Sequence, residues 1–152
     1  MQILLSKHNN KTVLTCTRAD GSFTRENLGP DFPNHDLAHF VVETTFQLEA
    51  GFFGNIKSGM TIQELSDKAV IRTLGPESWL AEILSRNLQG LASGACTPVE
   101  FIELVKWEVQ GMPQIQVPEM TPAMVEAMQT RFDDLCHSWE QLAENEQLKL
   151  VF

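Results

Sequence analysis

Residues 147–152 read Gln-Leu-Lys-Leu-Val-Phe, and this short stretch decides the fold class that the sequence predicts. Leu148, Leu150 and Phe152 recur at every second position, which is the spacing of a β-strand with one buried face. A single strand would leave its backbone N–H and C=O groups without partners, so it requires other strands to pair with. We therefore expect this segment to join strands from the beginning of the chain.

Those strands are predicted within the first thirty residues. Residues 2–7 and 12–18 are separated by His-Asn-Asn-Lys, in which asparagine tolerates the positive φ of a hairpin turn. A second tight turn, Ala-Asp-Gly at residues 19–21, leads into residues 22–28. The sequence thus predicts a three-strand antiparallel meander, with the C-terminal strand on its edge.

Between these strand regions the sequence predicts about five helices. The first begins after Asn34, a favourable N-cap residue, and ends just before Gly51. Thr61 and Thr97 each open a capping box, with glutamate three residues later, and each therefore begins a further helix. Residues 111–120 contain two prolines and predict an extended connector.

The other two predicted helices are more regular. One follows Gly75-Pro76, and the other begins at Thr121-Pro122. The last has apolar residues spaced alternately three and four apart: Val125, Met128, Phe132, Leu135, Trp139 and Leu142. The predicted fold class is α+β, a single domain over residues 1–152. It comprises a β-meander at 1–30, a helical region at 34–143 and a C-terminal strand at 146–152.

Composition restricts the class of function. A chain of 152 residues with 43% hydrophobic residues can bury a core without disulfides, and the three scattered cysteines predict buried free thiols. No apolar run is long enough for a membrane span or a secretion signal, so we expect a soluble cytoplasmic protein with no membrane partner. The formal net charge of −9 argues against nucleic-acid binding, which needs a cationic surface. A protein partner or a homodimer stays open, because the apolar positions of the last helix are also spaced like a dimer seam.

One stretch concentrates the residues that carry chemistry. Residues 35–43 read His-Asp-Leu-Ala-His-Phe-Val-Val-Glu and lie at the start of the first predicted helix. At about 100° per residue, His35, Asp36, His39 and Glu43 share one arc of this helix, opposite its apolar positions. These four residues are the candidate ligand or functional face.

Two histidines four residues apart favour a metal site, because they place two imidazoles on adjacent helical turns. With Glu43 one turn further on, His35, His39 and Glu43 are candidate ligands of a divalent transition metal such as zinc, iron, manganese or nickel. Asp36 would then orient an imidazole. The helix dipole near His35 favours its neutral form, which is the form that coordinates a metal.

One helix cannot enclose a metal ion alone. His35 and Glu43 lie about 12 Å apart along the helix axis, so they do not join the same mononuclear site. A site would combine His35 with His39, or His39 with Glu43, and add a ligand from another element or subunit. The sequence does not choose among the carboxylates considered for that role: Glu49, Glu64, Glu100, Glu103 and Glu108.

Two interpretations need no metal. In the first, the polar face is structural: Asp36 stabilises the helix start, His39 pairs with Asp36 or Glu43, and His35 bonds a loop carbonyl. In the second, a pair of His39 with Asp36 or Glu43 transfers protons, with the pKa of the histidine raised by its carboxylate.

The segment Gly-Phe-Phe-Gly at residues 51–54 predicts the end of the first helix, with Phe52 and Phe53 buried in the core. Alternatively, Phe46, Phe52 and Phe53 form an aromatic lip over a ligand pocket beside that helix.

Four stretches together resemble a known family. They are residues 15–22 (TCTRADGS), 35–43, 51–54 and the ending from Trp139 to residues 148–152 (LKLVF). The family consists of small bacterial proteins with a P-x-H-D-L-x-H-F-x-V-E type signature. The resemblance spans nearly the whole chain and implies one intact domain and a bacterial source. It implies no particular activity, cofactor or substrate.

The sequence leaves two functions open. One is a non-enzymatic domain that binds a partner or self-associates, with the histidine face structural or at an interface. The other is a metal-binding protein or metal-dependent hydrolase, with His35 or His39 as ligands and a carboxylate as ligand or base. The sequence favours the first, because no motif positions a nucleophile.

Overall fold

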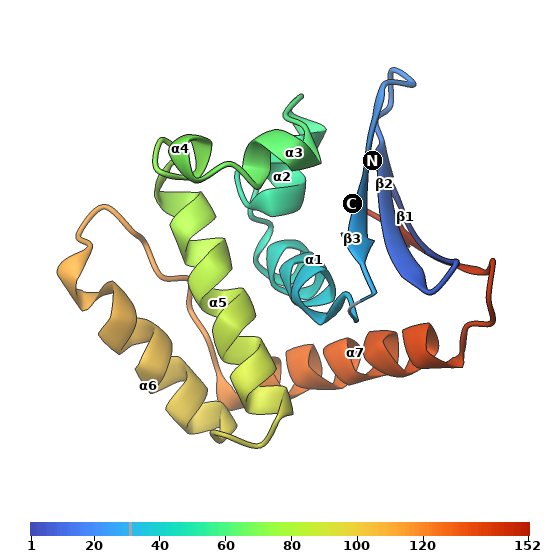
Figure 1. The fold of residues 1–152 in the computed structure, drawn as a ribbon. Coiled ribbons are helices and arrows are strands. Elements are labelled where there is room, and N and C mark those ends of the chain that lie inside the picture. The colour runs from blue at the N-terminus through green and yellow to red at the C-terminus, as the bar shows by residue number, and fades with distance from the viewer. Residues whose placement is uncertain (31) are drawn as a thin grey trace.

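The computed structural model describes residues 1–30 and 32–152, and its element order matches the α+β prediction (Figure 1). The elements in chain order are β1 (Gln2–His8), β2 (Lys11–Thr17), β3 (Phe23–Gly29), α1 (Asn34–Phe46), α2 (Phe52–Lys57), α3 (Ile62–Leu65), α4 (Lys68–Ile71), α5 (Pro76–Ala92), α6 (Pro98–Glu108), the 3₁₀ turn η1 (Val109–Gly111), α7 (Pro122–Gln141) and β4 (Gln147–Val151).

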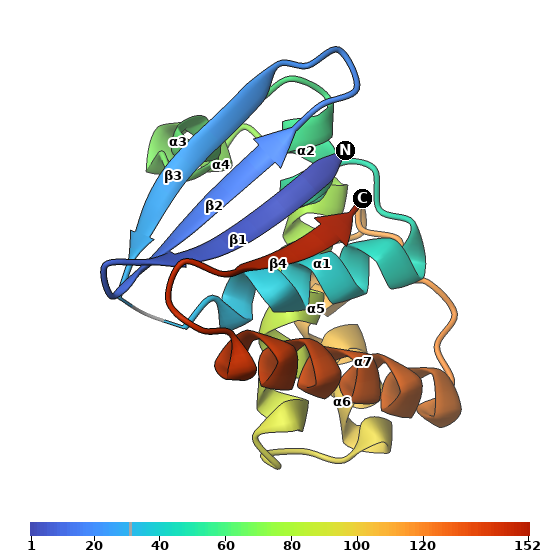
Figure 2. The same cartoon turned by 90° about the vertical axis from the view of Figure 1, so that its right-hand side faces the viewer.

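The sheet has the predicted composition, with strand order β3-β2-β1-β4 and antiparallel neighbours throughout (Figure 2). β4 pairs with β1, so Leu150 lies opposite Ile3, and Ile3 lies opposite Cys16 on its other side. The predicted pairing of the C-terminal strand with the meander is confirmed. Asn9 and Asn10 form the first hairpin turn with positive φ, as their short polar side chains allow.

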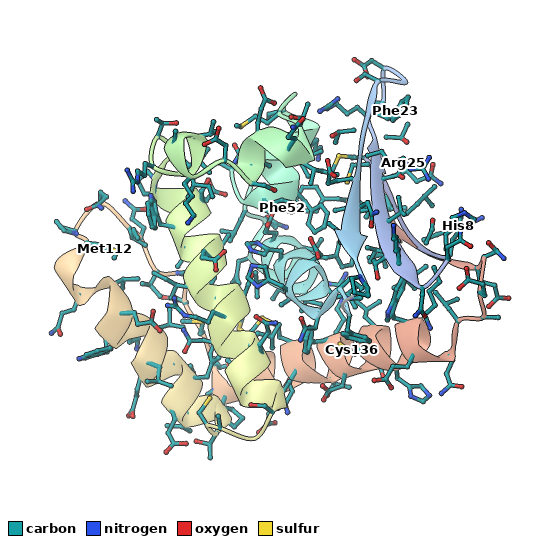
Figure 3. All side chains as sticks on the ribbon, viewed as in Figure 1. His8, Phe23, Arg25, Phe52, Met112 and Cys136 are labelled. Carbon is teal, nitrogen blue, oxygen red and sulfur yellow. The ribbon has the colours of Figure 1, made fainter. Side chains whose placement is uncertain are left out.

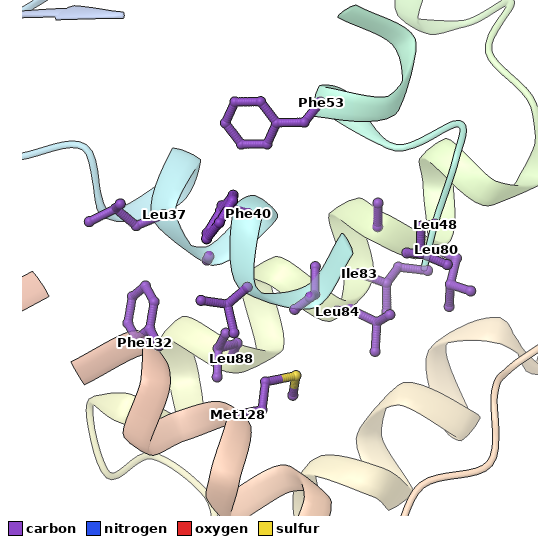
Figure 4. Close-up of a cluster of buried hydrophobic side chains, with 14 of the residues drawn as sticks. Leu37, Phe40, Leu48, Phe53, Leu80, Ile83, Leu84, Leu88, Met128 and Phe132 are labelled. Carbon is purple, nitrogen blue, oxygen red and sulfur yellow. The ribbon is translucent and has the colours of Figure 1, made fainter. Parts of the chain in front are cut away.

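Helix α1 lies at the centre of the core, between the sheet and α5 (Figures 1 and 2). Every residue from Leu37 to Glu43 is buried, because α1 also contacts α2 and α7. Figure 4 shows the apolar side chains that fill this region, with Phe40 of α1 near Phe53 of α2 and Phe132 of α7. A helix covered on so many sides can hold polar groups only where they find partners.

The structure has seven α-helices in its described part, against about five predicted. Helix α1 ends at Phe46, earlier than predicted, because Gln47 takes a left-handed conformation and donates its N–H to the carbonyl of Glu43. Residues 52–57, for which the sequence predicts no helix, form the short helix α2, in which Phe53 is buried as predicted and Phe52 is half-buried. The helix predicted from Thr61 is divided into α3 and α4.

The two predicted capping boxes are confirmed, whereas the predicted N-cap of the first helix is wrong. The capping boxes at Thr61 and Thr97 are present with both hydrogen bonds. Asn34 is not an N-cap: Pro33 holds that position, and Asn34 is the first helical residue. The predicted core residues of α7 are buried, except Leu135 and Leu142, which are half-buried.

The cysteines are all unpaired, as predicted. Their predicted burial is confirmed for Cys16 and wrong for Cys96 and Cys136, which are half-buried. Among the described residues, no helix is both long and apolar enough to cross a membrane.

Candidate functional site

The histidines of α1 face the side of α5, and a carboxylate of α5 lies between them. Nε2 of His39 is 3.2 Å from Oε2 of Glu82, and Nε2 of His35 is 3.4 Å from the same oxygen. His39 is buried, whereas the side chains of His35 and Glu82 are each 47% exposed. One donor atom from each of these three residues lies within 4.8 Å of the other two. We call them the His35–His39–Glu82 cluster.

A second carboxylate, that of Glu43, holds the imidazole of His39 at the ring nitrogen that does not face Glu82. Nδ1 of His39 donates to Oε1 of Glu43 at 3.0 Å, so the proton on this nitrogen is held by a group that can only accept. The opposite nitrogen, Nε2, is left to face Glu82. This hydrogen bond is one of the two pairs that the sequence left open for His39, and it determines the orientation of the imidazole.

Glu43 is also the cap of helix α2. Its two oxygens accept the backbone N–H groups of Phe52, Phe53 and Gly54 at 2.7, 3.0 and 3.1 Å. The N-terminus of a helix carries unpaired N–H donors and partial positive charge, which together stabilise a buried carboxylate. Glu43 has no exposed surface, and its four hydrogen bonds explain how it can be buried. It therefore supports His39 and is not itself a ligand in the cluster.

Gln89 gives His35 the corresponding support. Its Oε1 atom lies 3.1 Å from Nδ1 of His35, and Gln89 follows Glu82 by two turns of α5. Both histidines thus have Nδ1 engaged by a side-chain oxygen and Nε2 directed at Glu82. The two rings also meet edge to face, with centroids 4.8 Å apart.

The charges of the cluster shift one another's pKa values. Burial alone would lower the pKa of His39, but hydrogen bonds to Glu43 and Glu82 more than offset it and raise the pKa to about 9. The hydrogen bond to Glu82 likewise raises the pKa of His35. Hydrogen bonds from both histidines hold the pKa of Glu82 well below its ordinary value. The carboxylate thus opposes the effect predicted from the helix dipole, which favours a neutral His35.

Two of the three spacings between ligand atoms in the cluster match those of a bound metal ion, and the third, between the two histidine nitrogens, is no more than 4.8 Å. Ligand atoms bound tetrahedrally at about 2.0–2.1 Å from one metal lie about 3.3–3.4 Å from each other. The two distances from histidine nitrogen to Glu82 oxygen, 3.2 and 3.4 Å, are close to this spacing. Three protein ligands leave at least one coordination position open, and two of these three side chains are half-exposed.

A cavity of about 280 Å³ opens beside the cluster. His39 and Glu82 form part of its wall, together with Phe52, which lies between α1 and α2 in Figure 3. A larger cavity of about 490 Å³ lies on the side of α1 toward β4, and no histidine or cysteine lines it among the described residues. Of these two cavities, the smaller one therefore offers space for a ligand next to His39 and Glu82.

Of the predicted site residues, His35 and His39 come together with Glu82, and Glu43 supports them. Asp36 does not join them. It is half-buried, and burial raises the pKa of its carboxyl. Among the described residues, no cluster of potential metal ligands includes it. The predicted loop-carbonyl partner of His35 is wrong, since Gln89 takes that place.

The aromatic lip is present only in part. Phe52 lines the cavity and contacts the ring of His39, with centroids 5.6 Å apart. Phe53 is buried in the core, and Phe46 is half-buried against it without lining either cavity described above.

Glu82 and Gln89 were missed by reasoning from the sequence. They are seven residues apart, two turns of α5, and lie off its apolar stripe. Several other polar residues of α5 share that property, so the sequence contains no signal that separates these two from the rest.

No protein-family model, curated protein or solved structure matches this chain. The resemblance to a family of small bacterial proteins stays an expectation from the sequence. What the cluster does must therefore follow from its own geometry.

Proposed function

We propose that this protein binds one divalent transition-metal ion between His35, His39 and Glu82. The observation that carries the proposal is the convergence of two histidine Nε2 atoms on one carboxylate oxygen, at 3.4 and 3.2 Å. Metal-binding histidines commonly have their other ring nitrogen engaged by a carboxylate or carbonyl oxygen. Glu43 and Gln89 supply such oxygens here.

The chemical types of the ligand atoms restrict which metals can bind. Two imidazole nitrogens and one carboxylate oxygen suit zinc, and also iron, manganese or nickel. Magnesium and calcium prefer oxygen ligands alone. Three ligands leave an open position for water or for a donor atom of a second molecule, so the protein acts as a binding protein whose ligand meets the metal. The same open position is what a metal-dependent hydrolase needs to activate water.

The proposal is tested by measuring metal content and affinity with variants of the cluster. Tag-free protein purified without chelator should hold close to one metal ion per chain by elemental analysis. Glu82→Gln removes a charged ligand from a half-exposed position and keeps the side-chain volume. It should lower the zinc affinity measured by calorimetry by about 100-fold, and His39→Asn should abolish tight binding.

Two variants outside the cluster serve as controls. His137→Asn and Glu103→Gln change the same residue types at exposed positions of α7 and α6. Both should bind zinc as the wild type does. Unfolding temperatures measured in chelator show whether each variant is folded. Equal zinc affinity in wild type, Glu82→Gln and His39→Asn would overturn the proposal, as would the absence of any bound metal after incubation with zinc, manganese, iron and nickel.

A further inference from the structure

We infer that the cavity beside the cluster binds a small, mainly apolar organic molecule whose single polar head group reaches His39 and Glu82. Five large apolar side chains line this cavity: Phe52, Leu65, Ile71, Leu74 and Trp79. They come from α2, α3, α4 and α5 and from the segment before α5. The inference rests on the proposed function, because the metal offers the attachment point for the polar group.

Two further polar side chains, Asn55 and Ser78, line the wall, and the donor groups of both are already engaged. Nδ2 of Asn55 donates to the carbonyl of Ala50 at 2.9 Å and to Oγ of Ser78 at 2.9 Å. The hydroxyl of Ser78 donates to the same carbonyl. These bonds fasten the start of α2 to α5 and leave His39 and Glu82 as the titratable groups of the wall that can meet a ligand. No lysine or arginine lines the cavity in the described part of the chain, so a charged ligand body would lose its hydration without compensation.

The volume sets the size of the ligand. A protein cavity of about 150 Å³ with leucine, isoleucine and phenylalanine walls holds one benzene molecule. The present cavity, at about 280 Å³, has room for a substituted aromatic ring or an aliphatic chain of similar size. Trp79 is 40% exposed and stands at the rim, where a ring can stack on its indole.

Two hydroxamates that differ only in their apolar part test this inference. Benzohydroxamate and acetohydroxamate share the metal-binding group, and only the first carries a phenyl ring. On zinc-loaded protein, calorimetry should show about tenfold or greater preference for benzohydroxamate, since burying a phenyl ring in an apolar wall is favourable. In ¹⁵N-labelled protein, benzohydroxamate should shift the indole N–H resonance of Trp79 and leave that of Trp107 in place.

Variants at the two exposed tryptophans provide a matched control. Trp79→Gln should reduce the preference for benzohydroxamate about fivefold and leave zinc and acetohydroxamate affinities unchanged. Trp107→Gln, at a residue 71% exposed on α6, should change nothing. Equal affinity for the two hydroxamates, or an unshifted Trp79 resonance, would overturn the inference.

The arms of this experiment separate the two proposals. If zinc binds and the hydroxamates are not distinguished, the cavity inference is wrong and the metal proposal stands. If zinc does not bind, the metal proposal is wrong, and so is attachment of the ligand through a metal. A shift of the Trp79 resonance by millimolar benzohydroxamate in metal-free protein would then show that the apolar cavity binds rings by itself.

Discussion

His39 owes its chemistry to three neighbours that lie in three different places along the chain. Glu43 holds its Nδ1 from the same helix, Glu82 faces its Nε2 from α5, and Phe52 of α2 covers its ring. Exposed, an imidazole of this kind would titrate near pH 6.5, whereas here two carboxylates stabilise the imidazolium. A metal ion with the same ligands would replace that proton between His39 and Glu82.

The support that Gln89 gives His35 should be measurable. Gln89→Ala removes the oxygen that lies 3.1 Å from Nδ1 of His35 and leaves the cluster itself intact. Loss of such an orienting hydrogen bond typically lowers metal affinity by about 10-fold to 100-fold. Zinc calorimetry on Gln89→Ala should show a decrease in that range, beside Gln110→Ala at an exposed position of η1, which should not change. An unaltered affinity in Gln89→Ala would mean that the hydrogen bond does not position His35.

The stability of the metal-free protein should depend on pH through His39. Its pKa rises from 6.5 to about 9 on folding, so its ion pairs stabilise the folded protein fully below pH 6.5 and are lost as the pH rises through 9. At about 1.4 kcal/mol per pKa unit, the free energy of unfolding of the wild type should fall by about 3 kcal/mol over this range, relative to His39→Asn. The lowered pKa of Glu82 acts in the opposite direction and removes stability as the pH falls below 4.5.

Urea unfolding in the presence of chelator, at several pH values between 4 and 9.5, checks this prediction. The difference in free energy between wild type and His39→Asn should be largest between about pH 4.5 and 6.5. Parallel curves for the two proteins across the whole range would show that the charge of His39 does not contribute to folding.

At the scale of elements, α2 depends on a side chain from another helix. A helix of six residues has too few internal hydrogen bonds to be stable alone, and the carboxylate of Glu43 accepts the N–H groups at its start. Gly51 makes this approach possible. A Cβ atom on Gly51 would lie 2.3 Å from Cδ of Glu43. The glycine thus permits a capping contact and, through Glu43, the position of His39.

Gly51→Ala should therefore be strongly destabilising, and Gly75→Ala should not. Both glycines are N-caps with nearly the same extended backbone, φ −73° and ψ −163° at Gly51, φ −74° and ψ 174° at Gly75. A Cβ on Gly75 would meet nothing within 4 Å. We expect Gly51→Ala to lower the free energy of unfolding by about 3 kcal/mol or more and Gly75→Ala by about 1 kcal/mol or less. Similar losses in the two variants, measured by urea unfolding, would contradict the role of Gly51.

At the scale of the whole molecule, β4 connects the two ends of the described chain in one sheet. This strand brings residues near the end of the described chain beside β1, and Leu150 packs into the core opposite Ile3. Pairing segments so distant in sequence costs loop-closure entropy, which the buried side chains of β4 must offset. The helices between them, including α1 with both histidines, thereby share one hydrophobic core with the sheet.

Two neighbouring residues of β4 allow the contribution of side-chain burial to stability to be measured apart from that of backbone pairing. Leu150 is 8% exposed and Val151 is 79% exposed. Leu150→Ala should cost about 2–4 kcal/mol of stability, because it leaves a cavity in the core. Val151→Ala should cost less than about 1 kcal/mol. Comparable losses in both variants would indicate that β4 contributes through its backbone pairing and not through core packing.

Local patterns in the sequence were enough to predict the strands, the capping boxes and the long helices. Alternation in residues 147–152 and the three-four spacing in α7 depend only on which face of an element meets the core. The same patterns predict that His35, His39 and Glu43 share one face, and they offer Glu43 and Asp36 as alternative partners of His39, of which Glu43 is the one found. They do not predict α2 or the early end of α1, because these depend on Glu43 and Gln47 in their tertiary setting.

The position of Glu82, the third member of the cluster, is determined by the packing of α5 against α1. Glu82 approaches His35 and His39 only because α5 crosses α1 at their level, and the crossing point is determined by the apolar side chains of both helices in the core. Sequence patterns report the face on which a residue lies, which is a local property of one helix. Which residues of two helices meet depends on how the whole core is filled, and this decided that two histidines and one glutamate share a site.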